Sequence, residues 1–106
     1  MASDTGFPEL DRLSLNLPCR VFTEDDVYAA RLVDLSYGGA CVEAPDLPEF
    51  TPSGLTRIEA LGLGTLDVIF RWRRGARIGV SFRSDFEARP ILEAFFAAQG
   101  EALTGA

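Results

Sequence analysis

The six residues Asp34-Leu35-Ser36-Tyr37-Gly38-Gly39 lie between two short β-type runs and decide how the rest of the sequence is interpreted. In an extended segment Asp34 and Ser36 point the same way, because strand side chains alternate between the two faces of a sheet. The Gly38-Gly39 pair permits positive φ angles and a close approach to the backbone. The stretch predicts either a small polar platform for the edge of a planar ligand or a tight turn whose Asp and Ser bond their own backbone.

Alternating apolar residues before and after this stretch predict β-strands. From Leu13 to Val21 every second residue is apolar, which is the pattern of a half-buried strand. The segment from residue 44 to 54 contains three prolines and is expected to be a long loop, docked through Leu47 and Phe50. The remaining strands are expected at 27–35, 40–43, 55–61, 66–73 and 77–82.

The two last strands are expected to form a β-hairpin around a turn at 74–76. The strand at 66–73 shows the clearest alternation in the chain, with one face formed by Leu66, Val68, Phe70 and Trp72. The return strand alternates as well, through Ile78, Val80 and Phe82.

A short helix is expected after the hairpin. Leu92, Phe95 and Phe96 have helical spacing, Pro90 suits a first helical turn, and Gly100 suits a helix end. The prediction is a helix of about 10 residues that needs a sheet to pack on. The whole chain is therefore expected to be mainly β, a six-stranded antiparallel β-barrel with a C-terminal α-helix over residues 9–100, between tails at 1–8 and 101–106.

Composition narrows the possible functions. The chain has 106 residues, enough for one domain, and a net charge of −6, which disfavours binding to nucleic acid or to an anionic membrane. It has no histidine and only two separated cysteines, Cys19 and Cys41, so it lacks the usual groups of a catalytic triad or a metal site. We therefore expect a cytoplasmic protein that is not an enzyme and uses no cofactor or metal. All ten basic residues are arginine, the side chain best suited to bidentate recognition of phosphate and to stacking on bases.

The order of these parts resembles the PilZ family, the small β-barrel receptors for cyclic di-GMP. The resemblance extends from about residue 8 to residue 98. Arg12-Leu13-Ser14-Leu15-Asn16-Leu17-Pro18-Cys19-Arg20-Val21 is similar to the first strand of the family, and Asp34 to Gly39 matches its D/N-x-S-x-x-G motif. Trp72-Arg73-Arg74-Gly75-Ala76-Arg77-Ile78-Gly79-Val80-Ser81-Phe82 resembles its late hairpin.

The resemblance implies a nucleotide site. Arg12 corresponds to the second arginine of the family's R-x-x-x-R motif, Asp34 and Ser36 would meet a guanine edge, and Gly39 would keep the approach to the backbone open. Arg31, Arg20 and the hairpin arginines are further cations that could compensate for a missing partner, although a solvated polar face explains each of them separately. The predicted ligand-binding residues are Arg12, Arg31, Asp34, Ser36, Gly38 and Gly39.

One position departs from the family pattern. Pro8 stands where the first arginine of R-x-x-x-R belongs, and Glu9 and Asp11 follow it. Two functions therefore stay open. The first is a cyclic di-GMP receptor, a monomer or weak dimer that relays the second messenger to a partner protein. The second is a protein-interaction module of the same fold that no longer binds the nucleotide.

Overall fold

The computed structural model describes residues 12–48 and 54–105, with side chains for 13–48 and 54–99. The expected tail at 1–8 with Pro8, and the docking of Phe50, lie outside the described residues. Within these residues six strands and one helix follow one another: β1 (Arg12–Thr23), β2 (Val27–Ser36), β3 (Gly39–Glu43), β4 (Leu55–Ala60), β5 (Gly64–Arg74), β6 (Arg77–Phe82) and α2 (Asp85–Gly105).

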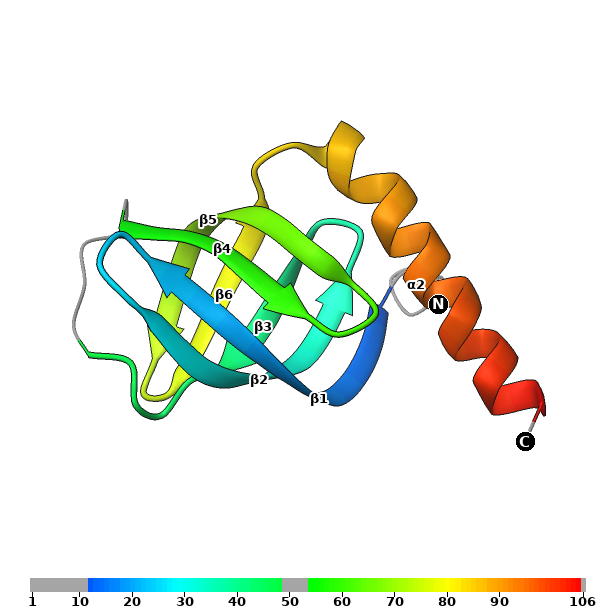
Figure 1. Ribbon diagram of the computed structural model, residues 1–106, viewed down its shortest axis with the longest axis horizontal. Coiled ribbons are helices and arrows are strands. Elements are labelled where there is room, and N and C mark those ends of the chain that lie inside the picture. Colours follow the sequence, from blue (N-terminus) through cyan, green and yellow to red (C-terminus); the bar gives the residue numbers. More distant parts are fainter. Residues whose placement is uncertain (1–11, 49–53, 106) are drawn as a thin grey trace, which may run out of the picture.

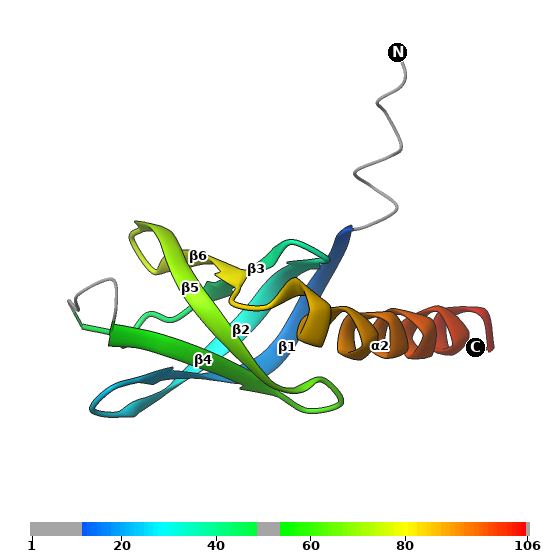
Figure 2. The same cartoon turned by 90° about the horizontal axis from the view of Figure 1, so that it is seen from above.

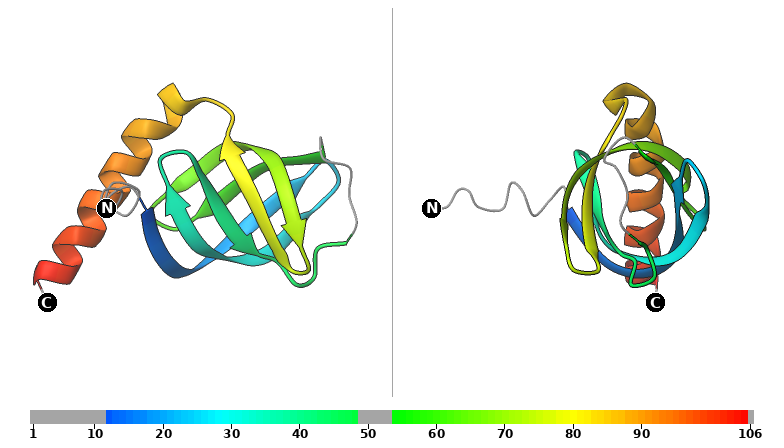
Figure 3. Two further views of the ribbon diagram at one scale, coloured as in Figure 1. Left: turned by 180° about the vertical axis from the view of Figure 1, so that it is seen from behind. Right: turned by 90° about the vertical axis from the view of Figure 1, so that its left-hand side faces the viewer.

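The strands form a closed antiparallel barrel in the order β1-β2-β3-β6-β5-β4, with β1 pairing β4 to complete the ring (Figure 1). A view along the barrel shows the ring of strands with α2 crossing its far opening (Figure 3). The expected fold, a six-stranded antiparallel barrel with a C-terminal helix, is confirmed. The pairing of β3 with β6 joins two hairpins that are distant in sequence and places them on one wall of the barrel.

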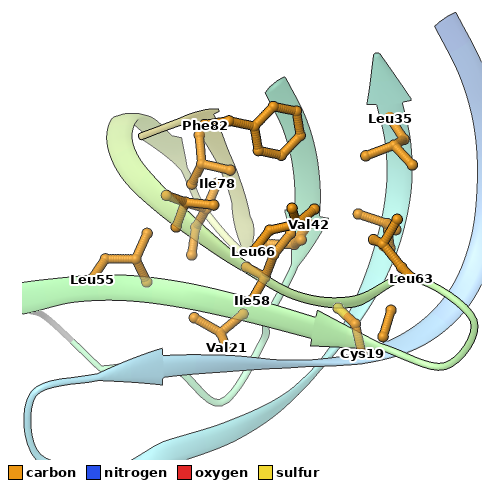
Figure 4. Packing of buried hydrophobic residues seen from close by; sticks show 14 of the residues in the cluster. Cys19, Val21, Leu35, Val42, Leu55, Ile58, Leu63, Leu66, Ile78 and Phe82 are labelled. Carbon is orange, nitrogen blue, oxygen red and sulfur yellow. The ribbon is translucent and has the colours of Figure 1, made fainter. Parts of the chain in front are cut away.

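Apolar side chains from all six strands fill the barrel (Figure 4). Buried side chains of α2 belong to the same cluster. The alternation expected in β1 holds at Cys19 and Val21, which are buried with Leu32 and Leu35 of β2. Burial raises the pKa of the Cys19 thiol to about 11, against a smaller opposing effect of the Arg31 charge. Cys19 is thus a neutral part of the core, and Cys41, also a free thiol, is only partly buried.

The expectation that Trp72 shares a face with Leu66 and Val68 is wrong. Phe70 lies opposite Val80 and Trp72 lies opposite Gly79, so β5 advances two residues while β6 advances one. This β-bulge at Arg71 reverses the alternation of the strand. Leu66 and Val68 face the core, whereas Trp72 is turned to the outside of the barrel and is 43% exposed.

The helix is also longer than expected. It spans 21 residues from Asp85 to Gly105, so Pro90 lies inside it and Gly100 does not end it. Its start is set by Ser84, whose hydroxyl oxygen accepts a hydrogen bond of 3.1 Å from the Glu87 backbone N–H. The part of the chain that the structure describes contains no helix that is both long and apolar enough to cross a membrane.

Leu47 of the loop after β3 is buried, as expected. Arg73 at the end of β5 holds this loop: its guanidinium donates to the carbonyl oxygens of Leu47 at 2.7 Å, Pro48 at 3.0 Å and Gly75 at 2.9 Å. This arginine therefore has a structural role near the β5–β6 turn, which lies at the end of the barrel away from α2 (Figure 2).

Candidate functional site

A groove of about 470 Å³ lies on the outer wall of the barrel, over β2, β3, β6 and β5. Its lining extends from Ser36 and Gly39, at the β2–β3 turn, to Arg74 and Arg77, at the β5–β6 turn. The first of these turns lies beside α2 and the second lies at the other end of the barrel (Figures 1 and 3). Its lining combines one carboxylate, one tryptophan and three arginines with small residues: Asp34, Ser36, Gly39, Ala40, Cys41, Arg71, Trp72, Arg74, Arg77, Gly79 and Val80.

The floor of the groove is a single row of paired residues. Asp34 lies opposite Cys41, Cys41 opposite Gly79, and Gly79 opposite Trp72, so one residue from each of four strands faces outward at the same level. The register shift between Leu32 and Asp34 makes this possible, because it keeps both Leu32 and Leu35 in the core while Asp34 turns outward. Two bulges, one in β2 and one in β5, thus bring the carboxylate and the indole to one surface.

Trp72 lies flat against Gly79. A Cβ atom added to Gly79 would come within 2.1 Å of the indole nitrogen, which only a glycine at this position avoids. The guanidinium carbon of Arg74 stands 5.6 Å from the centre of the Trp72 ring, in cation–π contact. The groove therefore contains an aromatic ring that the contact with Gly79 positions against the barrel wall.

The turn after β2 holds the second motif residue. Ser36 lines the groove with Asp34, as their spacing predicted. Its hydroxyl donates to the Gly39 carbonyl at 3.3 Å and accepts from the Gly38 backbone N–H at the same distance, so the local turn that the sequence also allowed does form.

The structure gives Gly38 and Gly39 roles that differ from those predicted from the sequence. Neither Gly38 nor Gly39 has a positive φ. A Cβ on Gly39 would meet the Val80 carbonyl oxygen at 2.2 Å, whereas a Cβ on Gly38 would meet nothing within 4 Å. Gly39 is therefore needed for the close approach of β3 to β6, which is a packing reason in addition to the expected access to the backbone.

Three arginines give the groove positive charge. The Nε of Arg71 donates to the Ser81 hydroxyl at 2.9 Å. Arg77 is 3.9 Å from the Glu43 carboxylate, a long and largely exposed ion pair that contributes little to stability. Within the described residues the terminal nitrogens of Arg71 and the guanidinium of Arg74 have no hydrogen-bonding or ionic partner, so their donors are available to an anion.

The other predicted arginines are placed differently. The backbone of Arg12 lies opposite Ser36, next to the groove, but its side chain is outside the described part. Arg31 donates to Asn16 at 2.7 Å and is not part of the lining. Arg20 pairs with Glu59 of β4, on a different wall.

The predicted site did not include four charged or aromatic residues of the groove: Arg71, Trp72, Arg74 and Arg77. The arginine cluster was visible in the sequence, but its proximity to Asp34 depends on the pairing of β3 with β6.

Known proteins agree with this architecture. The PilZ domain family matches residues 10–97, which is most of the chain. The chain belongs to the PilZ domain family. No curated protein matches this PilZ domain.

Two solved structures share the fold of this PilZ domain. The Legionella uncharacterized protein Lpg0364 has a TM-score of 0.61 at 15% identity, over 86% of this chain and 96% of that one. YcgR from Escherichia coli, in complex with c-di-GMP, has a TM-score of 0.58 at 23% identity, over 89% of this chain and 46% of that one. The PilZ domain described here thus spans less than half of the YcgR chain.

The PilZ groove has the chemistry to bind an anion that carries a planar base. A carboxylate accepts hydrogen bonds from an N–H edge, an indole stacks on a ring, and guanidinium groups pair with phosphate oxygens. Asp34 and Trp72 lie at the two ends of one row across four strands, with the arginines beside Trp72.

Proposed function

We propose that this PilZ domain binds cyclic di-GMP in the groove over β2, β3, β6 and β5 and relays the second messenger to a partner protein. The observation that carries the proposal is the row from Asp34 to Trp72, with Arg71, Arg74 and Arg77 around it. Membership of the PilZ family and the shared fold with YcgR, solved with c-di-GMP, support the choice of this nucleotide.

In this arrangement the Asp34 carboxylate accepts hydrogen bonds from the N1–H and N2–H groups of one guanine. Trp72 provides a face for stacking of a base, at about 1–3 kcal/mol for a base on an aromatic ring. Arg71, Arg74 and Arg77 pair with the phosphates through their planar N–H groups.

We expect the arginines of the β5–β6 hairpin to replace the phosphate contact that is lost because Pro8 stands in place of the first motif arginine. Loss of one hydrogen bond to a charged group costs roughly 1.5–3 kcal/mol. The three arginines of β5 and β6 line the groove and are able to offset a loss of that size. We therefore propose that the phosphates are bound by Arg12 from β1 together with the β5–β6 hairpin, with Arg31 outside the site.

Titration calorimetry of the full chain with cyclic di-GMP tests the proposal. We expect saturable binding that Asp34→Ala weakens by about 10- to 100-fold, from the lost hydrogen bonds to a charged group. Arg77→Gln is expected to weaken binding in the same assay. Arg57→Gln, on β4 outside the groove lining, is the matched control and should bind like the wild-type protein.

Cyclic di-AMP is the control ligand, because the N1 of adenine is an acceptor and repels a carboxylate. Absence of heat with cyclic di-GMP at high micromolar concentration would refute the proposal, as would equal binding of the two nucleotides.

One observation favours the second function, an interaction module that does not bind the nucleotide. The hydroxyl of Ser36 is already engaged by Gly38 and Gly39, which reduces what it can offer to a ligand. This alternative predicts that a partner protein is captured equally well with and without cyclic di-GMP. Capture that depends on the nucleotide would count against it.

A further inference from the structure

Tyr37, the residue between Ser36 and Gly38, contacts α2. Its ring centre is 5.2 Å from that of Phe96, in an edge-to-face arrangement at 85°. The guanidinium carbon of Arg89 lies 4.4 Å from the centre of the same ring, on its face. The β2–β3 turn that carries Tyr37 stands beside α2 (Figure 1).

The β2–β3 turn joins the contact of Tyr37 with α2 to the groove, because the residues involved are neighbours in the sequence. Ser36 lines the groove, Tyr37 meets α2, and the hydrogen bonds of the Ser36 hydroxyl to Gly38 and Gly39 close the turn around both residues. A ligand that contacts Ser36 therefore acts on the same turn that carries the Tyr37 ring. The β2–β3 turn alone is therefore enough to connect the groove to the helix.

Contacts besides that of Tyr37 also dock α2 on the barrel. Ala88, Leu92 and Phe95 are buried in the barrel core and fix α2 to the barrel opening. By contrast, the Arg89 side chain is largely exposed and also pairs with Glu93 at 3.4 Å. Tyr37 thus joins the β2–β3 turn to one partly buried residue of α2, Phe96, and to one exposed residue, Arg89.

We propose that Tyr37 is a positioning residue that couples the nucleotide groove to α2. This inference rests on the proposed function and adds the element that responds to it. Ligand bound at Asp34 and Ser36 holds the turn in one arrangement and strengthens the contact of Tyr37 with Phe96 and Arg89. Coupling is reciprocal, so a helix that loses this contact also weakens the groove for its ligand.

Two measurements on the full chain test the coupling: calorimetry with cyclic di-GMP and hydrogen exchange of α2 with and without the nucleotide. In the wild-type protein, saturation is expected to slow exchange of the α2 amides. Tyr37→Leu is expected to weaken binding about fivefold, at the low end of known coupling effects, and to abolish the response of α2. Tyr37→Phe keeps the ring and is expected to restore both to wild-type values.

Tyr28→Leu is the matched control, the same exchange at the other end of β2, where the ring packs against the core without contacting the groove. Binding without any change in α2 exchange would overturn the coupling and leave the proposed function intact. The same holds if Tyr37→Leu has no larger effect than Tyr28→Leu. Absence of binding by the wild-type protein would overturn both proposals.

Discussion

Three glycines near the groove differ in what a side chain would meet. At Gly38 a Cβ has open space, at Gly39 it would collide with the Val80 carbonyl, and at Gly79 it would collide with the Trp72 indole. A backbone carbonyl in a sheet cannot move without breaking strand pairing, whereas a tryptophan side chain that is partly exposed is able to rotate away. The same small substitution therefore has three different consequences.

Gly79→Ala is expected to displace Trp72 from the barrel wall and to weaken binding of cyclic di-GMP about tenfold, since one stacking surface is lost. Trp72 is the only tryptophan in the chain, so its fluorescence reports the displacement directly. A blue-shifted or unchanged emission maximum in Gly79→Ala would contradict the expected movement into solvent.

The other two glycines provide the comparison. Gly38→Ala is expected to leave emission and stability close to wild type, whereas Gly39→Ala is expected to lower stability by more than about 2 kcal/mol, measured by urea unfolding, because β3 must separate from β6. Equal stability of the two variants would show that the Gly39 approach is not required.

At the level of single residues the sequence predicted that Asp34 and Ser36 point the same way, and both line the groove, while their binding of a ligand stays a prediction. Alternation over two positions needs no knowledge of the fold. Trp72 could not be placed in the same way, because a β-bulge adds one residue to a strand without a pattern that marks it. A single extra residue reverses the direction of every later side chain in the strand.

Among the elements, α2 shows most clearly how a local signal was misinterpreted. Pro90 favoured a helix start at residue 90, but the Ser84-x-x-Glu87 capping pattern lies one and a half turns earlier and defines the actual start. Acidic Asp85 and Glu87 in the first turn favour that start further, through the helix dipole. The capping pattern was readable in the sequence and was the better predictor.

Pro90 therefore occupies an interior helical position, where it lacks an N–H for the Phe86 carbonyl. Pro90→Ala is expected to raise the free energy of unfolding by about 1–2 kcal/mol, less than the full helical penalty of about 3 kcal/mol because proline also restricts the unfolded chain. Urea unfolding monitored by circular dichroism measures the change. Glu93→Ala, another exposed position of α2, should shift stability by no more than about 0.5 kcal/mol, and a lower midpoint for Pro90→Ala would contradict the prediction.

On the scale of the whole molecule, charge is distributed unevenly. The chain carries a net charge of −6, yet three of its ten arginines surround one groove. Those arginines line the same groove as Asp34 only because the barrel pairs β3 with β6, a contact between distant segments that local patterns do not reveal. The strand and helix patterns predicted the barrel itself, but they did not specify which strands pair across it.

Binding of an anion in this groove is expected to depend on salt. Raising NaCl from about 50 mM to about 500 mM should weaken binding of cyclic di-GMP roughly three- to tenfold, because exposed arginine–phosphate attraction is screened within a few ångströms at the higher concentration. Calorimetry across the salt series measures this slope. Arg74→Gln and Arg77→Gln together should flatten it, and a slope unchanged by the double variant would place the phosphates elsewhere.

The closure of β1 onto β4 has a consequence for how another protein can attach. Where the strands overlap, the backbone has a neighbour on both sides: residues 19–22 of β1 pair with β2 on one side and with β4 on the other. An incoming peptide can therefore extend this sheet as an added strand only where a strand extends beyond one of its neighbours, as β1 does before Cys19. Elsewhere on the barrel, a partner must contact side chains, turns or the exposed side of α2.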